Sequence, residues 1–161
     1  MNNQKRPIAG RILVVDDVEG HVELFRRFLS AQGYVVTTVG DGEAALAAAT
    51  RDVPDVVLLD VLLPKLSGFE VCRRLKSDPA TRLIPVVMIT GLHDHNSRIQ
   101  AIEAGADDLL GKPVDRQELS ARVESLVRLK RYTDDLDSAK SVILSLGLTV
   151  EARDHYTEGH C

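Results

Sequence analysis

The chain has 161 residues, of which 44% are hydrophobic and 27% are charged, so it can bury a core and is not disordered by composition. Its formal net charge of −4 argues against a general nucleic-acid surface, and no apolar run is long enough to cross a bilayer. The two cysteines, Cys72 and Cys161, form no disulfide framework and fit a reducing compartment, so we expect a cytoplasmic protein without a membrane or nucleic-acid partner.

The first part of the chain alternates short apolar runs with helical patterns. Residues 11–15, 34–39 and 56–60 are rich in β-branched and aliphatic side chains, which predicts three strands. A helical pattern follows the first run as far as Gly33, which suits a helix C-terminus, and Asp41 is the expected N-cap of an alanine-rich helix. The order is therefore strand, helix, strand, helix, strand.

The second part continues this alternation. Ser67 and Glu70 have the spacing of a capping box, so a helix should begin there. A fourth strand is expected over 85–90, with its proline at the first position, where no ladder donor is lost. After a polar loop we expect a short helix over 97–104 and a weaker strand over 107–111, followed by a long helical pattern.

Five strands that alternate with five helices predict an α/β fold with a doubly wound parallel sheet, because right-handed βαβ crossovers place helices on both faces. The carboxyl ends of parallel strands share one edge, and ligands bind at that edge in such sheets. The predicted edge carries Asp16, Asp17, Asp60, Thr90 and Lys112.

The acidic residues at this edge predict a cation site. Three carboxylates in one crevice repel each other unless a cation neutralises them, and Mg²⁺ prefers carboxylate, water and phosphate oxygens. A carboxylate beside Mg²⁺ and a lysine is suited to accept a phosphoryl group, and a threonine hydroxyl can donate to that group. Asp60, at the end of the most apolar run, is the candidate acceptor.

The ordered set of motifs resembles the receiver domain of two-component response regulators. The resemblance covers Arg11 to Leu129 and rests on Asp16-Asp17, Leu58-Leu59-Asp60 with Pro64 and Gly68, Ile89-Thr90-Gly91, Gly105-Ala106-Asp107-Asp108 and Lys112-Pro113. It implies a flavodoxin-like (βα)5 fold with strand order 2-1-3-4-5. It also implies a phosphoacceptor domain rather than an enzyme in its own right.

The resemblance assigns expected roles to single residues. A sensor histidine kinase would phosphorylate Asp60, and Thr90 and Lys112 would contact the phosphoryl group. The Mg²⁺ ligands would be Asp16, Asp17, Asp60 and the backbone carbonyl of Leu62. The Lys112–Pro113 bond would be cis, an isomer that costs little before proline.

Two features depart from the family pattern. Leu109 stands three residues before the lysine, where the family commonly has an aromatic side chain that changes rotamer on activation. Leu62 and Leu92 stand two residues beyond the aspartate and the threonine, at positions that help to place the hydrolytic water in the family. With no polar group there, we expect slow self-dephosphorylation.

Single residues also have ordinary structural explanations. Asp17 could cap the helix that follows it. We expect Cys72 to be a small core residue, and His21 to face solvent. His93 and His95 lie in a polar stretch without matching ligands, so we expect them at the surface.

Beyond the receiver, the apolar residues change to heptad spacing. Intervals of three and four alternate through Leu129, Tyr132, Leu136, Ala139, Ile143, Leu146 and Val150. This pattern predicts a helical linker over 130–150 that either packs on its own receiver or pairs two subunits as a coiled coil. We favour pairing, which would make a homodimer through the C-terminal helix.

The last residues, 145–160, resemble the entry to HD-GYP domains, which hydrolyse cyclic di-GMP. His160 matches a position that can bind metal in that family, whereas His155 stands where the family more often has proline. The His-Asp pair and the Gly-Tyr-Pro motif of that family are absent from this tail. We therefore expect 151–161 to be the truncated start of an effector domain, after a disordered lead over 1–8 and a receiver over 9–129.

Other functions agree less well with the sequence. A phosphatase of the haloacid dehalogenase type uses Asp-x-Asp, whereas Asp60 is followed by Val61 and Leu62. A dinucleotide-binding protein would carry Gly-x-Gly-x-x-Gly after the first strand, and this chain does not. The alternative that stays open is a stand-alone receiver that acts as a phosphate sink or a protein-interaction module.

Overall fold

The computed structural model describes residues 10–91 and 93–158, with side chains as far as residue 147. The predicted lead over 1–8, Leu92 and the side chains of the tail that includes His155 and His160 lie outside the described residues. The elements in chain order are β1 (Arg11–Val15), α1 (Glu19–Ala31), β2 (Val35–Val39), α2 (Gly42–Asp52), β3 (Val56–Asp60), α3 (Gly68–Ser77), β4 (Val86–Thr90), α4 (His95–Glu103), β5 (Asp108–Gly111) and α5 (Arg116–Glu158).

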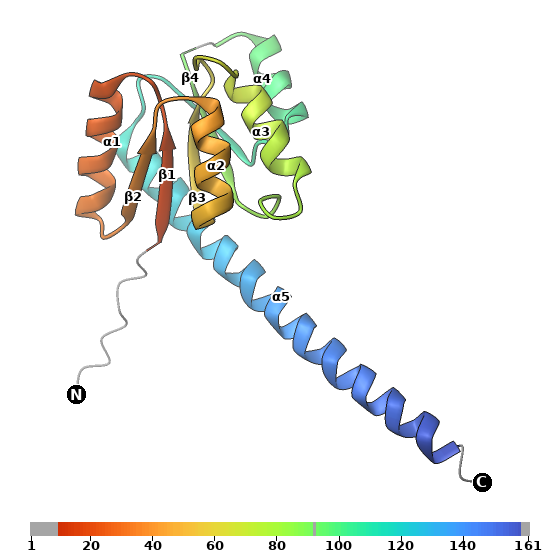
Figure 1. The fold of residues 1–161 in the computed structure, drawn as a ribbon. Helices are drawn as coiled ribbons and strands as arrows, with labels where there is room; N and C mark the ends of the chain where they lie inside the picture. The colour runs from red at the N-terminus through yellow and green to blue at the C-terminus, as the bar shows by residue number, and fades with distance from the viewer. Residues whose placement is uncertain (1–9, 92, 159–161) are drawn as a thin grey trace, which may run out of the picture. The chain divides into compact units, whose positions relative to one another are not determined.

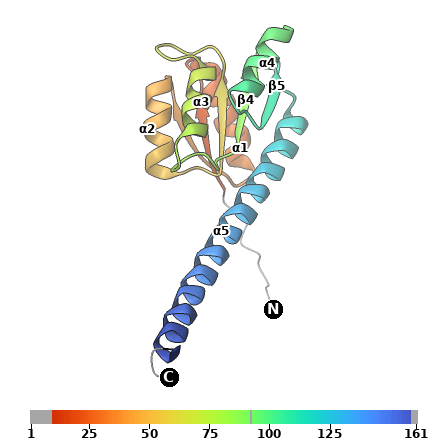
Figure 2. The same ribbon diagram turned by 90° about the vertical axis from the view of Figure 1, so that its right-hand side faces the viewer.

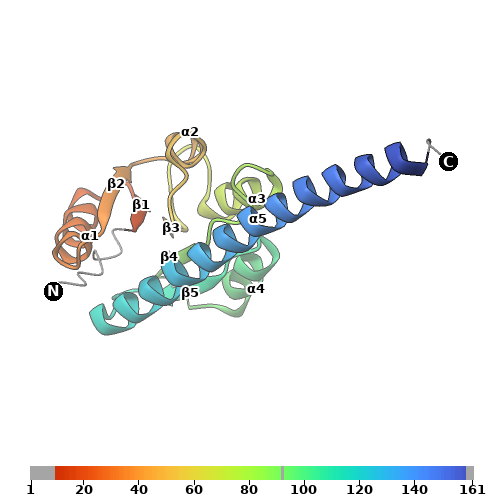
Figure 3. The same ribbon diagram turned by 90° about the horizontal axis from the view of Figure 1, so that it is seen from below.

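The strands form one five-stranded parallel sheet in the order β2-β1-β3-β4-β5 (Figure 1). In Figure 3 the strands stand in a row, with α1 and the start of α5 on one side and α2, α3 and α4 on the other. Helices α2 and α3 lie side by side, as Figures 1 and 2 show. The predicted doubly wound α/β fold with strand order 2-1-3-4-5 is therefore confirmed.

Two hydrophobic clusters hold the helices to the sheet. On one face, Phe25 and Leu29 of α1 and Leu119 and Val123 of α5 pack against alternate residues of the strands. On the other face, the small and branched side chains of α2, α3 and α4 pack against the remaining alternate residues. Every residue of the central strand β3 is buried, because both of its faces are covered.

Side-chain caps fix where α2 and α4 begin. Asp41 accepts a hydrogen bond from the Ala44 N–H at 2.8 Å, as predicted for an N-cap. Asp94 accepts one from the Ser97 N–H at 2.8 Å, so α4 begins at His95. The predicted start of this helix at residue 97 was therefore two residues late, because Asp94 caps it.

Only one of the two hydrogen bonds of a capping box forms at the start of α3. The Ser67 hydroxyl accepts from the Glu70 N–H at 3.2 Å, but Glu70 pairs with Arg73 and Arg74 instead of reaching back. The helix ends at Ser77. Gly33, which follows α1, has a φ of 95°, in the left-handed region that glycine adopts without strain.

The chain divides into two units, residues 1–130 and 131–161. The second unit is a helical stretch that belongs to α5, and its side chains are exposed from residue 134 to residue 147. Among the helices of the described residues, none combines the length and the apolar character that a membrane span needs.

Candidate functional site

Asp60 ends the central strand β3 with its side chain held at both oxygens. The Lys112 ammonium lies 2.6 Å from Oδ2, and the Leu62 N–H donates to Oδ1 at 3.0 Å. Asp60 is only 5% exposed, although a carboxylate adds nothing to the apolar packing of the strand. Packing does not explain a buried carboxylate at a strand end beside a lysine, so Asp60 is a candidate functional residue.

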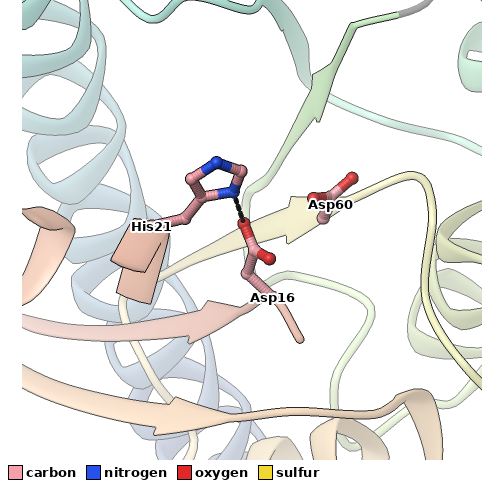
Figure 4. A group of neighbouring side chains, drawn as sticks. All are labelled: Asp16, His21 and Asp60. Atoms are coloured by element: carbon pink, nitrogen blue, oxygen red, sulfur yellow. Dashed lines mark hydrogen bonds and ion pairs between the residues drawn. The ribbon is translucent and has the colours of Figure 1, made fainter. Parts of the chain in front are cut away.

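Asp16 follows β1 and lies next to Asp60 at the same edge of the sheet (Figure 4). Its Oδ1 accepts from the Val18 N–H at 2.8 Å, and its Oδ2 lies 3.1 Å from Nδ1 of His21 on α1. Figure 4 shows the imidazole turned toward Asp16. The expectation that His21 simply faces solvent was therefore incomplete, because its ring is part of this cluster while remaining 44% exposed.

The environment of Asp16 disfavours its negative charge. Burial raises the pKa of this carboxyl above its usual value, and the nearby charge of Asp60 raises it further. The Val18 N–H, the Lys112 ammonium and His21 act in the opposite direction but do not cancel the effect. Burial is the main reason why the negative charge of Asp16 is disfavoured here.

Thr90 and Lys112 come to the site from the ends of β4 and β5. Thr90 is the last residue of β4, is 3% exposed and lies opposite Gly111 in the strand register. The Lys112 N–H donates to the Thr90 carbonyl at 2.8 Å, which ties the two strand ends together. The Lys112–Pro113 bond is cis, as predicted.

Two of the predicted Mg²⁺ ligands, Asp17 and Leu62, have exposed side chains. Asp17 is exposed and is not part of the group in which Asp16, His21 and Asp60 gather. Leu62 is beside Asp60 through its backbone N–H, and its side chain is 65% exposed. Metal binding by Asp17 and by the carbonyl of Leu62 stays a prediction.

The site has the donor set of a divalent cation. Asp16, His21 and Asp60 each offer a ligand atom, and these atoms lie within 4.8 Å of one another. Two of the three donors are carboxylate oxygens, which a hard cation such as Mg²⁺ prefers. A bound cation would also stabilise the negative charge of Asp16, which burial disfavours. The residues present therefore fit such an ion.

Sequence reasoning missed His21 as a neighbour of the site, although its position carried a usable pattern. His21, Phe25 and Leu29 are spaced four apart, and such residues lie on one face of a helix. Phe25 and Leu29 are buried against the sheet, so His21 had to point toward the sheet edge.

A family model described as the response regulator receiver domain matches residues 12–124. Response regulator PleD of Caulobacter vibrioides is 54% identical over 129 residues, which make up 80% of this chain and 28% of PleD. The chain spans less than two thirds of the length of this and other curated relatives.

Solved structures agree in fold. The signal receiver domain of a signal transduction histidine kinase from Syntrophus aciditrophicus is 35% identical with a TM-score of 0.71, over 74% of this chain and 91% of that one. The receiver domain of a sensor histidine kinase from Pseudomonas aeruginosa is 30% identical with a TM-score of 0.70, over 74% of this chain and 98% of that one. That structure has a magnesium ion coordinated in its active-site cleft.

Proposed function

This chain belongs to the family of response regulator receiver domains, and we propose that Asp60 is its phosphoacceptor. The observation that carries the proposal is the carboxylate of Asp60, buried at the end of β3 and contacted by Lys112 at 2.6 Å. The phosphoryl donor is a sensor histidine kinase. An oxygen of Asp60 forms a bond to phosphorus while the bond from phosphorus to the donor nitrogen breaks.

The neighbouring residues prepare Asp60 for this transfer. Lys112 holds the carboxylate before the reaction and pairs with a phosphoryl oxygen after it, so its charge serves both states. The Thr90 hydroxyl, at the end of the adjacent strand, donates to the incoming group. Mg²⁺ would be held by Asp16, Asp17, Asp60 and the Leu62 carbonyl, and it would neutralise charge on the transferring oxygens.

The donor protein must bring its phosphohistidine up to this edge. A largely apolar groove of about 220 Å³ lies beside the site, and both His21 and Lys112 line it. Leu24 and Phe28 of α1 contribute to the same groove. An apolar surface that borders a reactive carboxylate supports docking of a protein donor.

Labelling with a small phosphodonor tests the proposal. The wild-type chain should be phosphorylated by acetyl phosphate in the presence of Mg²⁺, and Asp60→Asn should not. Asp55→Asn is a matched control, because Asp55 precedes the same strand and its carboxylate accepts a hydrogen bond from the Arg11 N–H, away from the site. Labelling of the Asp60→Asn chain at the wild-type level would refute the assignment.

We further propose that phosphorylation is relayed through α5 to an HD-GYP phosphodiesterase domain that acts on cyclic di-GMP. The support is the resemblance of residues 145–160 to the entry of such domains. The coding sequence beyond residue 161 tests this directly. A His-Asp pair and a Gly-Tyr-Pro motif there would support the proposal, and a different effector domain would contradict it.

The alternative function is a stand-alone receiver that acts as a phosphate sink or a protein-interaction module. The two functions differ in what activation does to the oligomeric state. Size-exclusion chromatography with and without beryllofluoride, which mimics a phosphoryl group, separates them. A shift toward the dimer on activation, at concentrations where the unactivated chain is mostly monomeric, favours the relay. An elution volume that activation changes at no concentration favours the stand-alone module.

A further inference from the structure

The helical segment 131–147 carries an apolar stripe that is exposed to solvent. Tyr132, Leu136, Ile143 and Leu146 are each more than 60% exposed. Large hydrophobic side chains that recur on one line of a helix are costly to leave in water. The stripe therefore indicates a surface that another chain covers.

The spacing of the stripe is that of a two-stranded coiled coil. Leu136 and Ile143 occupy the a positions of the heptad, and Tyr132, Ala139 and Leu146 occupy the d positions. Side chains at these positions interlock with those of a second helix. The last heptad has β-branched isoleucine at a and leucine at d, a combination that favours two strands.

The charges that flank the stripe select the direction of pairing. Asp135 is at a g position and Lys140 is at the following e position, and a parallel in-register pair brings a g residue opposite the next e residue of the other helix. An antiparallel pair places g against g and e against e. Within 131–147 that arrangement offers Asp135 only another aspartate or Val142, and so forms no ion pair across the seam.

Neither charge is engaged in an ion pair among the described residues of the chain. Both side chains are exposed and free to reach a second helix. We propose that residues 131–147 of two copies of this chain pair as a parallel, in-register coiled coil, with Asp135 of each copy facing Lys140 of the other. This inference does not rest on phosphorylation of Asp60, so the pairing should persist in Asp60→Asn.

Disulfide trapping tests direction and register in the full chain. In a Cys161→Ser background, Leu146→Cys places a thiol at a d position near the end of the seam. Parallel in-register pairing brings the two thiols together, so oxidation should give a covalent dimer. Ser141→Cys is the control, because residue 141 lies at an f position on the outer face. Equal trapping of both variants, or none of Leu146→Cys, would overturn the proposal.

A charge exchange provides a second, independent measurement. Sedimentation equilibrium should show dimers of the wild-type chain, and Asp135→Lys or Lys140→Asp alone should raise the dissociation constant about fivefold, because each dimer gains two like-charge contacts. The double variant should return to within about twofold of wild type. A wild-type chain that stays monomeric at the highest concentration, or a double variant weaker than both single variants, would overturn the proposal.

Discussion

Leu62 stands two residues beyond Asp60, where the resemblance to receiver domains leads us to expect water to approach the phosphoryl group. Its N–H holds Asp60, while its side chain is 65% exposed and offers no hydrogen-bonding group to a nucleophilic water. We therefore expect the phosphorylated chain to lose its phosphoryl group slowly, over many minutes or longer. Leu62→Asn should shorten the lifetime, because an amide can orient water.

Decay of the phosphorylated chain after removal of the donor measures this lifetime without any phosphatase. Leu83→Asn is a matched control, since Leu83 is an exposed leucine outside the site. A wild-type half-life of seconds, or equal acceleration by both substitutions, would contradict the role given to Leu62.

Burial lowers the reactivity of the Cys72 thiol. Burial raises the pKa of its thiol to about 11, and its Sγ lies 3.4 Å from the Ala104 carbonyl oxygen. At pH 8 this leaves about 100-fold less thiolate than at an ordinary thiol with a pKa of 9.0. Iodoacetamide should label the peptide that contains Cys72 only after denaturation, as peptide mass spectrometry can show. Rapid labelling of the folded chain would contradict this environment.

The residues of the site were predictable from sequence to the extent that strand ends set their positions. Asp16, Asp60, Thr90 and Lys112 follow or end four strands, and parallel topology alone brings them together. The hydrogen bond between His21 and Asp16 was not predicted: the spacing of His21, Phe25 and Leu29 gives the face of α1, but the contact itself depends on the conformation of the β1–α1 loop. The exposure of Asp17 likewise depends on the conformation of the β1–α1 loop, which no periodic pattern specifies.

At the scale of the element, the N-cap of α2 gives a test in pH. The Ala44 N–H and, to a smaller extent, Lys65 hold the pKa of Asp41 below its usual value. A carboxyl with a lowered pKa in the folded state stabilises the fold above the unfolded-state pKa of about 3.9, and this contribution is lost as pH falls through the folded-state pKa.

Urea unfolding of the wild type and of Asp41→Asn should therefore differ in pH dependence. The wild type should lose more stability than Asp41→Asn as pH falls from 5 to below the usual aspartate pKa, because asparagine caps without titrating. Between pH 5 and 7 the difference between the two should stay constant. Parallel curves through the acid range would contradict the role of the charge.

The start of α3 is packed against the strand that carries the site. A Cβ at Gly68 would lie 2.2 Å from the carbonyl oxygen of Asp60, which is backbone and cannot move aside. Gly68→Ala should therefore cost about 1–3 kcal/mol of stability, as overpacking usually does. Gly20→Ala is the control, because nothing lies within 4 Å of its Cβ, and should change stability by less than about 0.5 kcal/mol. Equal stability of the two variants in urea would refute this packing.

Element boundaries were predicted well where a cap or a run of β-branched residues marks them. The strands β1 and β3 have the expected bounds, and α2 begins after its predicted cap. The start of α4 was misplaced, since the polar residues at 94–96 suggested a loop while Asp94 is a cap. Leu109 packs partly buried against the cluster on the α2, α3 and α4 side, a contact that depends on tertiary packing rather than on local pattern.

At the scale of the molecule, one sheet serves both stability and chemistry. Apolar residues on both faces bury the strands, and the polar residues gather at the strand ends, where backbone pairing no longer needs apolar neighbours. The apolar runs of β1, β3 and β4 predict this separation, because each run leads directly into a polar residue, Asp16, Asp60 or Thr90, at its carboxyl end. The proposed pairing of α5 with a second copy involves a surface that a single chain leaves exposed, so only the heptad spacing of the sequence anticipates it.

The central claim is that the buried carboxylate of Asp60, assisted by a cation and Lys112, accepts a phosphoryl group. The most direct test is to phosphorylate the wild-type chain with acetyl phosphate, reduce the acyl phosphate with borohydride and locate the resulting homoserine by mass spectrometry. We predict homoserine at residue 60 when Mg²⁺ is present, and none when the metal is chelated. Homoserine at residue 16 or 17 in place of 60, or equal conversion after chelation, would contradict the account.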